Sequence, residues 1–306
     1  MAADLRRDPV RIQVPASSAN IGPAFDSAGL ALDIVDDLVA MITDDDGVLI
    51  EVIGEGAESV PLDDSHLVAR AMARGFAVMD AHPRGFILRC DNAIPHGLGL
   101  GSSAAAIVGG LALARALVVG GETLLPNADL LQVAKSMESH PDNISAALNG
   151  GLTFAWINEA GIAGHIRLEL HPAIRPVIAM PAAGLPTAEA RLALPRAVAF
   201  GDAAFNVARS ALLLHALTSE PAHLMEATSD RLHQELRRSM YAPSLDLVEA
   251  LRAAGIPAAI SGAGPSVMAL ASPATADLVA VLAGTGWQVR QVGVAGQGVR
   301  TVPIAL

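Results

Sequence analysis

The chain is poor in lysine, cysteine and aromatic side chains. Of its 20 basic residues only Lys135 is a lysine, so a site for a polyanion must rely on arginine, backbone N–H groups or a metal ion. A single cysteine, Cys90, cannot form an internal disulfide. The first residues, MAADLRRDPV, contain no apolar stretch of the signal-peptide type. The single cysteine and the lack of a signal-peptide stretch predict a reducing, cytoplasmic location.

Basic charge and long apolar runs are also scarce. The 31 acidic residues outnumber the 20 basic ones, giving a net charge of −11, which argues against nucleic-acid or anionic-membrane binding. A content of 52% apolar and 17% charged residues excludes a disordered chain. The most apolar stretch, residues 104–120, contains Arg115 and is shorter than the ~20 residues of a membrane span, so a buried helix is expected there.

The 306 residues suffice for about two domains of ~150 residues each. In the N-terminal part, alternation predicts a strand over Val10–Val14 that ends at Pro15. Apolar runs follow at Leu30–Met41 and Val48–Ile53. Further strands are expected at Phe86–Cys90, Leu152–Ile157 and His165–Leu170, and helices at His66–Asp80 with Ser65 as its cap, Ser102–Val119, Asn127 to near Pro141, and a short piece from Asn143.

Prolines at residues 171–176 suggest a boundary, so we expect domains at 1–171 and 172–306. The second part is predicted to contain strands at Val177–Met180, Ala258–Ser261, Ser266–Ala271 and Trp287–Val292, and helices at Phe205–Thr218, Ala222–Arg238, Ser244–Ala254 and Thr275–Ala283. The fold class predicted for the whole chain is α+β.

The strongest chemical signal is the segment P-H-G-L-G-L-G-S-S-A-A at residues 95–105. Glycines at alternate positions between a strand and a helix can expose several backbone N–H groups, and the helix N-terminus adds its positive dipole end. This arrangement suits a phosphate. The segment is neither a Walker A loop nor a dinucleotide fingerprint, and an ordinary strand-to-helix turn remains the alternative.

Two other segments are candidates for ligand binding. Glu138, at the end of a helix, could join a serine hydroxyl of the glycine segment in a Mg²⁺ site, or could be a solvated glutamate near an arginine or Lys135. The segment V-P-A-S-S-A-N-I-G-P-A-F-D-S-A-G-L-A-L at residues 14–32 has two strong polar groups, Asn20 and Asp26. These could face a small ligand or make turn hydrogen bonds of the Asx kind. Taken by itself, the glycine turn at residues 261–266 favours a tight hairpin over a ligand site.

Together these segments resemble the three motifs of the GHMP kinase superfamily, and within it the homoserine kinase family. That narrower likeness is carried by residues 14–32, E-S-H-P-D-N-I at 138–144, L-P-T-A-E-A-R at 185–191 and the stretch 230–238, so it covers nearly the whole chain. The resemblance implies a domain like the second domain of ribosomal protein S5, followed by a ferredoxin-like domain, with the active site between them. It also implies ATP-dependent phosphorylation of the hydroxyl of L-homoserine to O-phospho-L-homoserine, with Mg²⁺, in threonine biosynthesis.

The resemblance assigns site residues by position. The ATP-binding loop would comprise Pro95, His96, Gly97, Leu98, Gly99, Leu100, Gly101, Ser102, Ser103, Ala104 and Ala105, with Ser103 and Glu138 as the Mg²⁺ ligands. The substrate residues would be Asn20, Asp26, His140, Asn143, Arg191 and Arg237, and the catalytic ones Asn20, Thr187 and Arg191. By charge, Arg191 and Arg237 suit the substrate carboxylate and Asp26 the ammonium group.

The resemblance further implies in-line attack by the substrate hydroxyl without a dedicated strong base, and often a homodimer. Three residues depart from the family pattern: Ala24 and Ser139 stand where glycine is common, and Leu98 replaces a small or basic residue. Ala24 would narrow the substrate loop if that position has positive φ. The rival functions are phosphorylation of another small alcohol, such as threonine or mevalonate, and non-catalytic ATP sensing.

Overall fold

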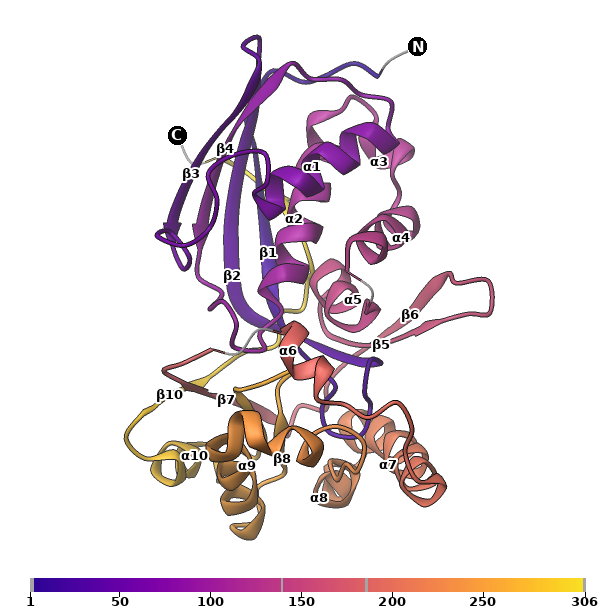
Figure 1. Ribbon diagram of the computed structural model, residues 1–306, viewed down its shortest axis with the longest axis vertical. Helices are drawn as coiled ribbons and strands as arrows, with labels where there is room; N and C mark the ends of the chain where they lie inside the picture. The colour runs from indigo at the N-terminus through magenta and orange to yellow at the C-terminus, as the bar shows by residue number, and fades with distance from the viewer. Residues whose placement is uncertain (1–2, 139, 185–186, 305–306) are drawn as a thin grey trace.

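A computed structural model describes residues 3–138, 140–184 and 187–304, the side chains at 187 and 188 excepted, as two β-sheets with helices packed on them (Figure 1). The larger sheet has the order β11-β1-β2-β4-β3, with β5 paired to β2 and β6 to β5. Its strands are β1 (Val10–Ala19), β2 (Ala28–Thr43), β3 (Gly47–Gly54), β4 (Gly85–Asn92), β5 (Leu152–Ile157), β6 (Ala163–Leu168) and β11 (Arg300–Val302). Of these pairings only β3 with β4 is parallel.

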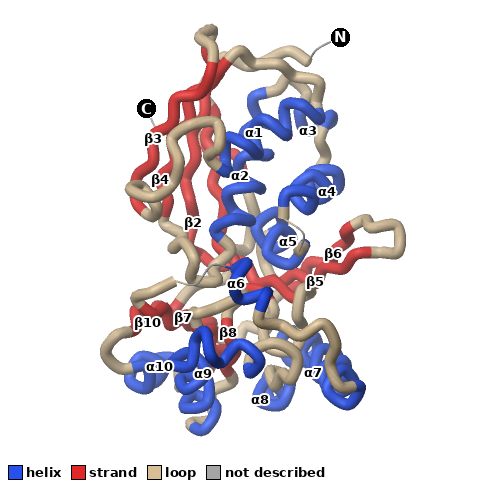
Figure 2. The backbone as a smooth tube through the Cα atoms, viewed as in Figure 1, coloured by secondary structure: helices blue, strands red, loops and turns tan. Residues whose placement is uncertain are grey.

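Helices cover one side of this sheet (Figures 1 and 2). They are α1 (Leu67–Val78), α2 (Ser102–Leu117), α3 (Gly121–Leu124), α4 (Asn127–Met137) and α5 (Pro141–Asn149). The predicted buried helix is confirmed as α2, in which small residues permit close packing: a Cβ on Gly109 would meet the Leu38 side chain, and one on Gly110 the backbone of Val68. Among the helices of the described residues, none is both long and apolar enough to cross a membrane.

The smaller sheet is entirely antiparallel and has the order β10-β7-β9-β8. Its strands are β7 (Arg175–Pro181), β8 (Ala258–Ile260), β9 (Val267–Ala271) and β10 (Trp287–Gln291). The helices in this part of the chain are α6 (Thr187–Leu192), α7 (Phe200–Thr218), α8 (Leu224–Ala227), α9 (Arg238–Ala253) and α10 (Ala276–Ala283). Residues of α9 and α10 share a hydrophobic core with this sheet. The predicted α+β class is thus confirmed.

The predicted end of the first strand at Pro15 is wrong. β1 continues to Ala19, and its register with β2 shifts between Pro15 and Ala16. A proline is tolerated at such an irregularity because the missing N–H is not needed there. The longer strand carries the chain directly to Asn20, so the first candidate site residue lies at the end of a buried strand.

The predicted helix over Ala222–Arg238 is also wrong. The chain instead forms the short helix α8 and a separate 3₁₀ turn at Glu235–Arg237, with an irregular stretch between them. Asp230 explains the break, because its carboxylate accepts the backbone N–H groups of the next residues, Leu232, His233 and Gln234. Those groups would otherwise make helical hydrogen bonds.

Three further details differ from the expectations. Ser65 does not cap α1; its hydroxyl donates to Asp63, and His66 occupies the N-cap position without a side-chain hydrogen bond. Helix α9 begins at Arg238, ahead of the expected Ser244, but non-helical backbone at Tyr241 (φ −147°, ψ 46°) divides it, so its second part, which contains Pro243, begins close to the expected position. Strand β11 was not predicted and returns the chain to the first sheet, where it pairs with β1. The division into 1–171 and 172–306 therefore stays a prediction.

Candidate active site

Three glycine-containing segments meet where the two sheets approach each other. They are the phosphate loop (residues 95–105), the substrate loop (residues 20–26) and the turn at residues 261–266. Ser261 Oγ donates to the carbonyl of Gly99 at 2.7 Å, and Gly262 N donates to that of Ala19 at 3.0 Å. Asn20 Nδ2 donates to the Gly262 carbonyl at 2.7 Å. The turn is thus a tight hairpin held against the other two loops.

The phosphate loop needs glycine at alternate positions. Gly97, Gly99 and Gly101 have φ values of +68°, +71° and +69°, a region that residues with a Cβ avoid. Gly101 is the N-cap of α2 and has no side chain with which to cap the first N–H groups of the helix. Such groups, together with the helix dipole, form an anion site.

Replacing Gly101 with alanine is expected to weaken ATP binding. A Cβ there would clash with the hydroxyl of Ser17 and approach Asn143, in addition to the ~1–2 kcal/mol cost of left-handed backbone in a residue other than glycine. We expect the KM for ATP to rise at least about tenfold, a loss of 1.4 kcal/mol of binding energy. Gly120→Ala is the matched control, because Gly120 has a similar φ of +72° and open space around it. Equal effects of the two substitutions on the KM would contradict this role.

Ser103 and Glu138 are brought together. Ser103 Oγ donates to Glu138 Oε2 at 2.9 Å, and burial raises the pKa of Glu138 although this hydrogen bond opposes the shift. Lys135 does not form an ion pair with Glu138. Its Nζ instead donates to the Gly161 carbonyl at 2.7 Å. The hydroxyl of Ser103, in the first turn of α2, and the carboxylate of Glu138, which ends α4, are hard oxygen donors of the kind that Mg²⁺ prefers.

The residues described include no group of three or more His, Cys, Asp and Glu side chains that could hold a metal ion alone. Mg²⁺ is usually bound by one or two protein ligands together with substrate phosphates and water. Ser103 and Glu138 beside the phosphate loop fit that pattern.

Asp26 and Arg191 form a bidentate ion pair. Arg191 Nη2 lies 2.7 Å from Asp26 Oδ1, and Nη1 lies 3.2 Å from Oδ2. His140 Nε2 lies 3.9 Å from Asp26 Oδ2, and the Arg191 guanidinium lies over the ring of Phe25. A fork that holds one carboxylate in this way can hold the carboxylate of a ligand. The sequence-predicted substrate residues Asp26, Arg191 and His140 therefore lie together.

The substrate loop has a strained backbone. Asn20, Ile21 and Asp26 have φ values of +68°, +45° and +56°, and Asp80 is the only other non-glycine residue with positive φ among those described. Asn20 Oδ1 accepts the backbone N–H of Asp26 at 2.9 Å, so the Asx-type turn contact is present. Strain of this kind persists where the surrounding structure holds the backbone, and it gathers at functional sites.

The departures from the family pattern have different outcomes. Ala24 is buried but has no positive φ, so it adds no backbone strain to the substrate loop. Leu98 is half-buried and packs against the core of the first sheet. Ser139 lies outside the described residues.

The remaining predicted residues are placed differently. Arg237 is 2% exposed; its Nε donates to the carbonyl of Ala190 at 2.6 Å, and its guanidinium lies 5.6 Å from the Phe25 ring centre. Asn143 accepts from Ser17 Oγ at 2.9 Å and lies beside the phosphate loop. Thr187 begins α6, but its side chain is not among those described.

Sequence reasoning missed a pocket beside the N-terminus of α2. It is a cavity of about 300 Å³ whose lining includes Asp36, Leu38, Val60, His66, Asn92 and Ala106. His66 Nδ1 is buried and has no hydrogen-bond partner among the described residues. Because the pocket also touches Ser102 and Ser103, it could receive the base of a nucleotide whose phosphates lie on the loop. The local pattern around His66 indicated only a helix start.

A buried carboxyl group lies near Asp26, Glu138 and Arg191. Asp142 is 2% exposed, and burial raises its pKa to about 7, against the hydrogen bond from the Asn143 N–H. Because the folded protein holds this proton to a higher pH than the unfolded chain does, stability falls as the pH rises from about 4 to about 7.

Asp142→Asn should remove this pH-dependent destabilisation and can still accept the Asn143 N–H. We expect its Tm to exceed that of the wild type at pH 8.5 by several degrees, because a pKa raised from 3.8 to about 7 corresponds to roughly 4 kcal/mol of lost stability at that pH. At pH 5, where Asp142 is protonated, the two values should nearly coincide. A difference independent of pH would show that the pKa of Asp142 is the same in the folded and the unfolded protein.

Comparisons with known proteins agree with this geometry. The family model for the GHMP kinases N-terminal domain matches residues 66–151, and the model for the GHMP kinases C-terminal domain matches residues 210–281. The homoserine kinase of Streptomyces coelicolor is 49% identical over 97% of this chain and 95% of its own. That of Streptomyces avermitilis is 48% identical over 97% of this chain and 96% of its own.

The fold has a match among crystal structures. The structure of a homoserine kinase from Cytophaga hutchinsonii superposes with a TM-score of 0.84, covers 99% of this chain and 100% of its own, and is 24% identical. At that identity the match shows the fold alone; together with the two family models it confirms the GHMP kinase fold. With the sequence relatives, it leads to one assignment: the chain belongs to the homoserine kinase family of the GHMP kinases, which are ATP-dependent kinases of small molecules.

Proposed function

We propose that this protein transfers the γ-phosphoryl group of ATP to the side-chain hydroxyl of L-homoserine and forms O-phospho-L-homoserine for threonine biosynthesis. The observation that carries this proposal is the bidentate Asp26–Arg191 pair, in a loop that Asn20 joins to the turn contacting Gly99 of the phosphate loop. It offers one negative and one positive group to a substrate that carries both charges. The names of the relatives in Streptomyces support the same substrate.

ATP is the co-substrate of the family, and we propose that Mg²⁺ accompanies it. Ser103 and Glu138 would hold the ion, which when bound would neutralise phosphate charge. The phosphates would contact the N–H groups at the start of α2, and the base would enter the cavity lined by His66 and Asn92. Glu138 thereby acquires the positive partner that a half-buried carboxylate at a helix C-terminus requires.

The protein's own residues would act mainly by positioning. Asp26 and Arg191 would fix the two charged ends of homoserine, which leaves its hydroxyl to face the γ-phosphate. The N–H groups of the phosphate loop would stabilise the charge of the transferred group. No dedicated strong base is required in this proposal, and Lys135 is held by the Gly161 carbonyl.

The proposal is tested by offering the purified protein Mg-ATP with L-homoserine, L-threonine or mevalonate and recording ADP release. We expect the highest kcat/KM with L-homoserine. Mevalonate should react poorly because it has no ammonium group for Asp26. Turnover of another alcohol without turnover of homoserine would overturn the proposed substrate, and ATP binding without any turnover would favour a sensor.

Location and assembly are part of the same proposal. The reaction consumes ATP, which supports a cytoplasmic site of action. A homodimer is supported by the hairpin of β5 and β6, which exposes Trp156, Ile157 and Ile166 and extends away from the body of the protein in Figure 1. Size-exclusion chromatography with light scattering would measure the assembly state.

A further inference from the structure

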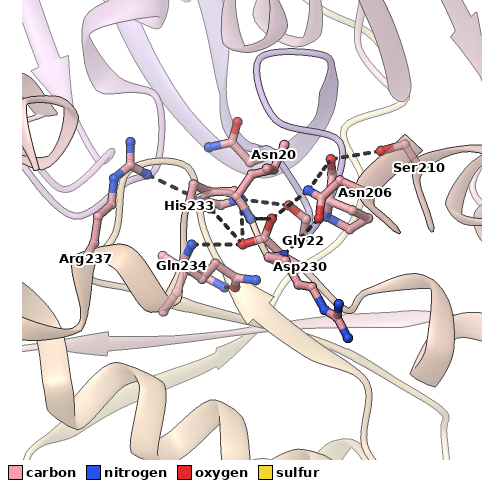
Figure 3. A network of polar contacts seen from close by, with 12 residues as sticks. Asn20, Gly22, Asn206, Ser210, Asp230, His233, Gln234 and Arg237 are labelled. Atoms are coloured by element: carbon pink, nitrogen blue, oxygen red, sulfur yellow. Dashed lines mark hydrogen bonds and ion pairs between the residues drawn. The ribbon is translucent and has the colours of Figure 1, made fainter. Parts of the chain in front are cut away.

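A buried histidine lies beneath the substrate loop and has no role in the proposal above. His233 is fully buried, in the turn that follows Asp230. Its Nε2 lies 2.7 Å from the Gly22 carbonyl, and its Nδ1 lies 3.4 Å from Nη1 of Arg237 (Figure 3). One imidazole ring thus connects the substrate loop to an arginine that we assign to the substrate.

The two contacts fix the tautomer of this ring. A guanidinium can only donate hydrogen bonds, so Nδ1 of His233 accepts from Arg237, and Nε2 carries the hydrogen that is donated to the Gly22 carbonyl. Burial lowers the pKa of His233, although nearby Asp230 opposes this shift. The contact with Arg237 requires a neutral ring, because a protonated Nδ1 could not accept a hydrogen bond, whereas the contact with Gly22 suits either form.

The ring itself is held in place by its neighbours. Asp230 accepts the backbone N–H of His233 at 3.1 Å and a hydrogen bond from Asn206 Nδ2 at 2.8 Å. The ring packs against Phe25 with 4.9 Å between centres. Backbone, carboxylate and aromatic contacts all restrain the ring of His233. Its fixed position can therefore fix the positions of the two groups that it contacts.

The substrate loop depends on such restraint. Asn20, Ile21 and Gly22 have positive φ in succession, and the Gly22 carbonyl lies between Asn20 and Asp26 in the sequence. The next carbonyl, that of Pro23, accepts from Ser210 Oγ at 2.8 Å and from Asn206 Nδ2 at 3.4 Å. His233 thus links the strained part of the loop to Arg237 by hydrogen bonds, beside the ring of Phe25, which contacts both side chains.

We propose that His233 is a positioning residue for the amino-acid substrate, which holds the Asn20–Asp26 loop in its binding geometry through Gly22 and orients Arg237 toward the substrate carboxylate. It contacts no reacting atom and acts through these two groups. The proposal rests on the proposed function, because it requires a substrate that Asp26 and Arg237 both recognise.

Two substitutions, called half-replacements below, each keep one of the two contacts of His233 and remove the other. In His233→Asn the amide oxygen can take the place of Nδ1 and accept from Arg237, while the donor to Gly22 is lost. In His233→Gln the amide nitrogen can take the place of Nε2 and donate to Gly22, while the acceptor for Arg237 is lost. We expect each to raise the KM for homoserine about tenfold, as loss of one hydrogen bond does, with the KM for ATP within about twofold of wild type.

Gln234→Leu is the matched control for stability. Gln234 is buried in the same turn, and its Oε1 accepts the backbone N–H of Ile260 at 2.7 Å, so the substitution should lower Tm without changing the KM for homoserine. If the half-replacements lower Tm but leave that KM unchanged, or raise the KM for ATP equally, the positioning role is wrong. His233→Ala, which loses both contacts, should raise the KM for homoserine more than either half-replacement does.

The wild-type enzyme distinguishes this test from that of the proposed function. If it uses another amino-acid alcohol instead of homoserine, the proposed substrate fails, and the same KM comparison with that alcohol still tests His233. If no compound with both an ammonium and a carboxylate group is a substrate, both proposals are overturned.

Discussion

Glu138→Gln is expected to lower kcat by about 10²–10³-fold, the effect of removing one group that stabilises charge in a transition state. The amide keeps the shape of the side chain and its hydrogen bond from Ser103 Oγ. It loses the negative charge that would hold Mg²⁺. ADP release in the presence of homoserine measures the effect, and a higher Mg²⁺ requirement in any residual activity should accompany it.

The same substitution should not harm the fold. Because burial raises the pKa of Glu138, the charged carboxylate lowers stability above pH ~4.5, and a neutral amide relieves this cost. The Tm at pH 8 should therefore equal or exceed that of the wild type. Glu159→Gln, an exposed change of the same charge, is the control and should leave kcat unaltered. If Glu138→Gln retained full activity, Glu138 would not be a metal ligand.

Much of the fold could be predicted because its elements carry strong local signals. The small-residue helix α2 and the hairpin of β5 and β6 were expected at nearly the bounds observed. The failures occur where a tertiary or side-chain contact overrides the pattern. Strand β11 has only three residues and exists because β1 offers it a free edge. No local periodicity encodes such a partner.

The break at Asp230 could have been found from the sequence. T-S-D at residues 228–230 is a cluster of helix-capping residue types within an otherwise helical pattern. The apolar spacing on both sides of this cluster favoured a single long helix and so concealed the break. The break matters because it turns His233 toward the substrate loop.

Less of the site than of the fold could be predicted from the sequence. Asp26 and Arg191 are 165 positions apart, so no spacing rule predicts that they pair, and the expectation came from the resemblance alone. The glycines of the phosphate loop were predictable because positive φ requires them at a strand-to-helix turn. The cavity that contains His66 was not, since it is formed by side chains from several elements.

Asp26→Asn and Arg191→Met are expected to change which alcohol the enzyme accepts. In the structure the two side chains neutralise each other, and a substrate with both charges can replace each half of the pair with its own groups. Removing one half leaves one end of homoserine without a partner. We expect kcat/KM for homoserine to fall at least about tenfold in each variant, since a hydrogen bond to a charged group contributes about 1.5–3 kcal/mol.

Two truncated alcohols identify which end each residue binds. 4-Hydroxybutyrate lacks the ammonium group of homoserine, and 3-aminopropan-1-ol lacks its carboxylate. Asp26→Asn should reduce the preference for homoserine over 4-hydroxybutyrate and leave its preference over 3-aminopropan-1-ol nearly unchanged, while Arg191→Met should do the reverse. This crossed pattern depends on charge at two separate points, so a general loosening of the site cannot produce it. Equal loss of both preferences in both variants would mean that Asp26 and Arg191 act only on each other, as a structural ion pair between the substrate loop and α6.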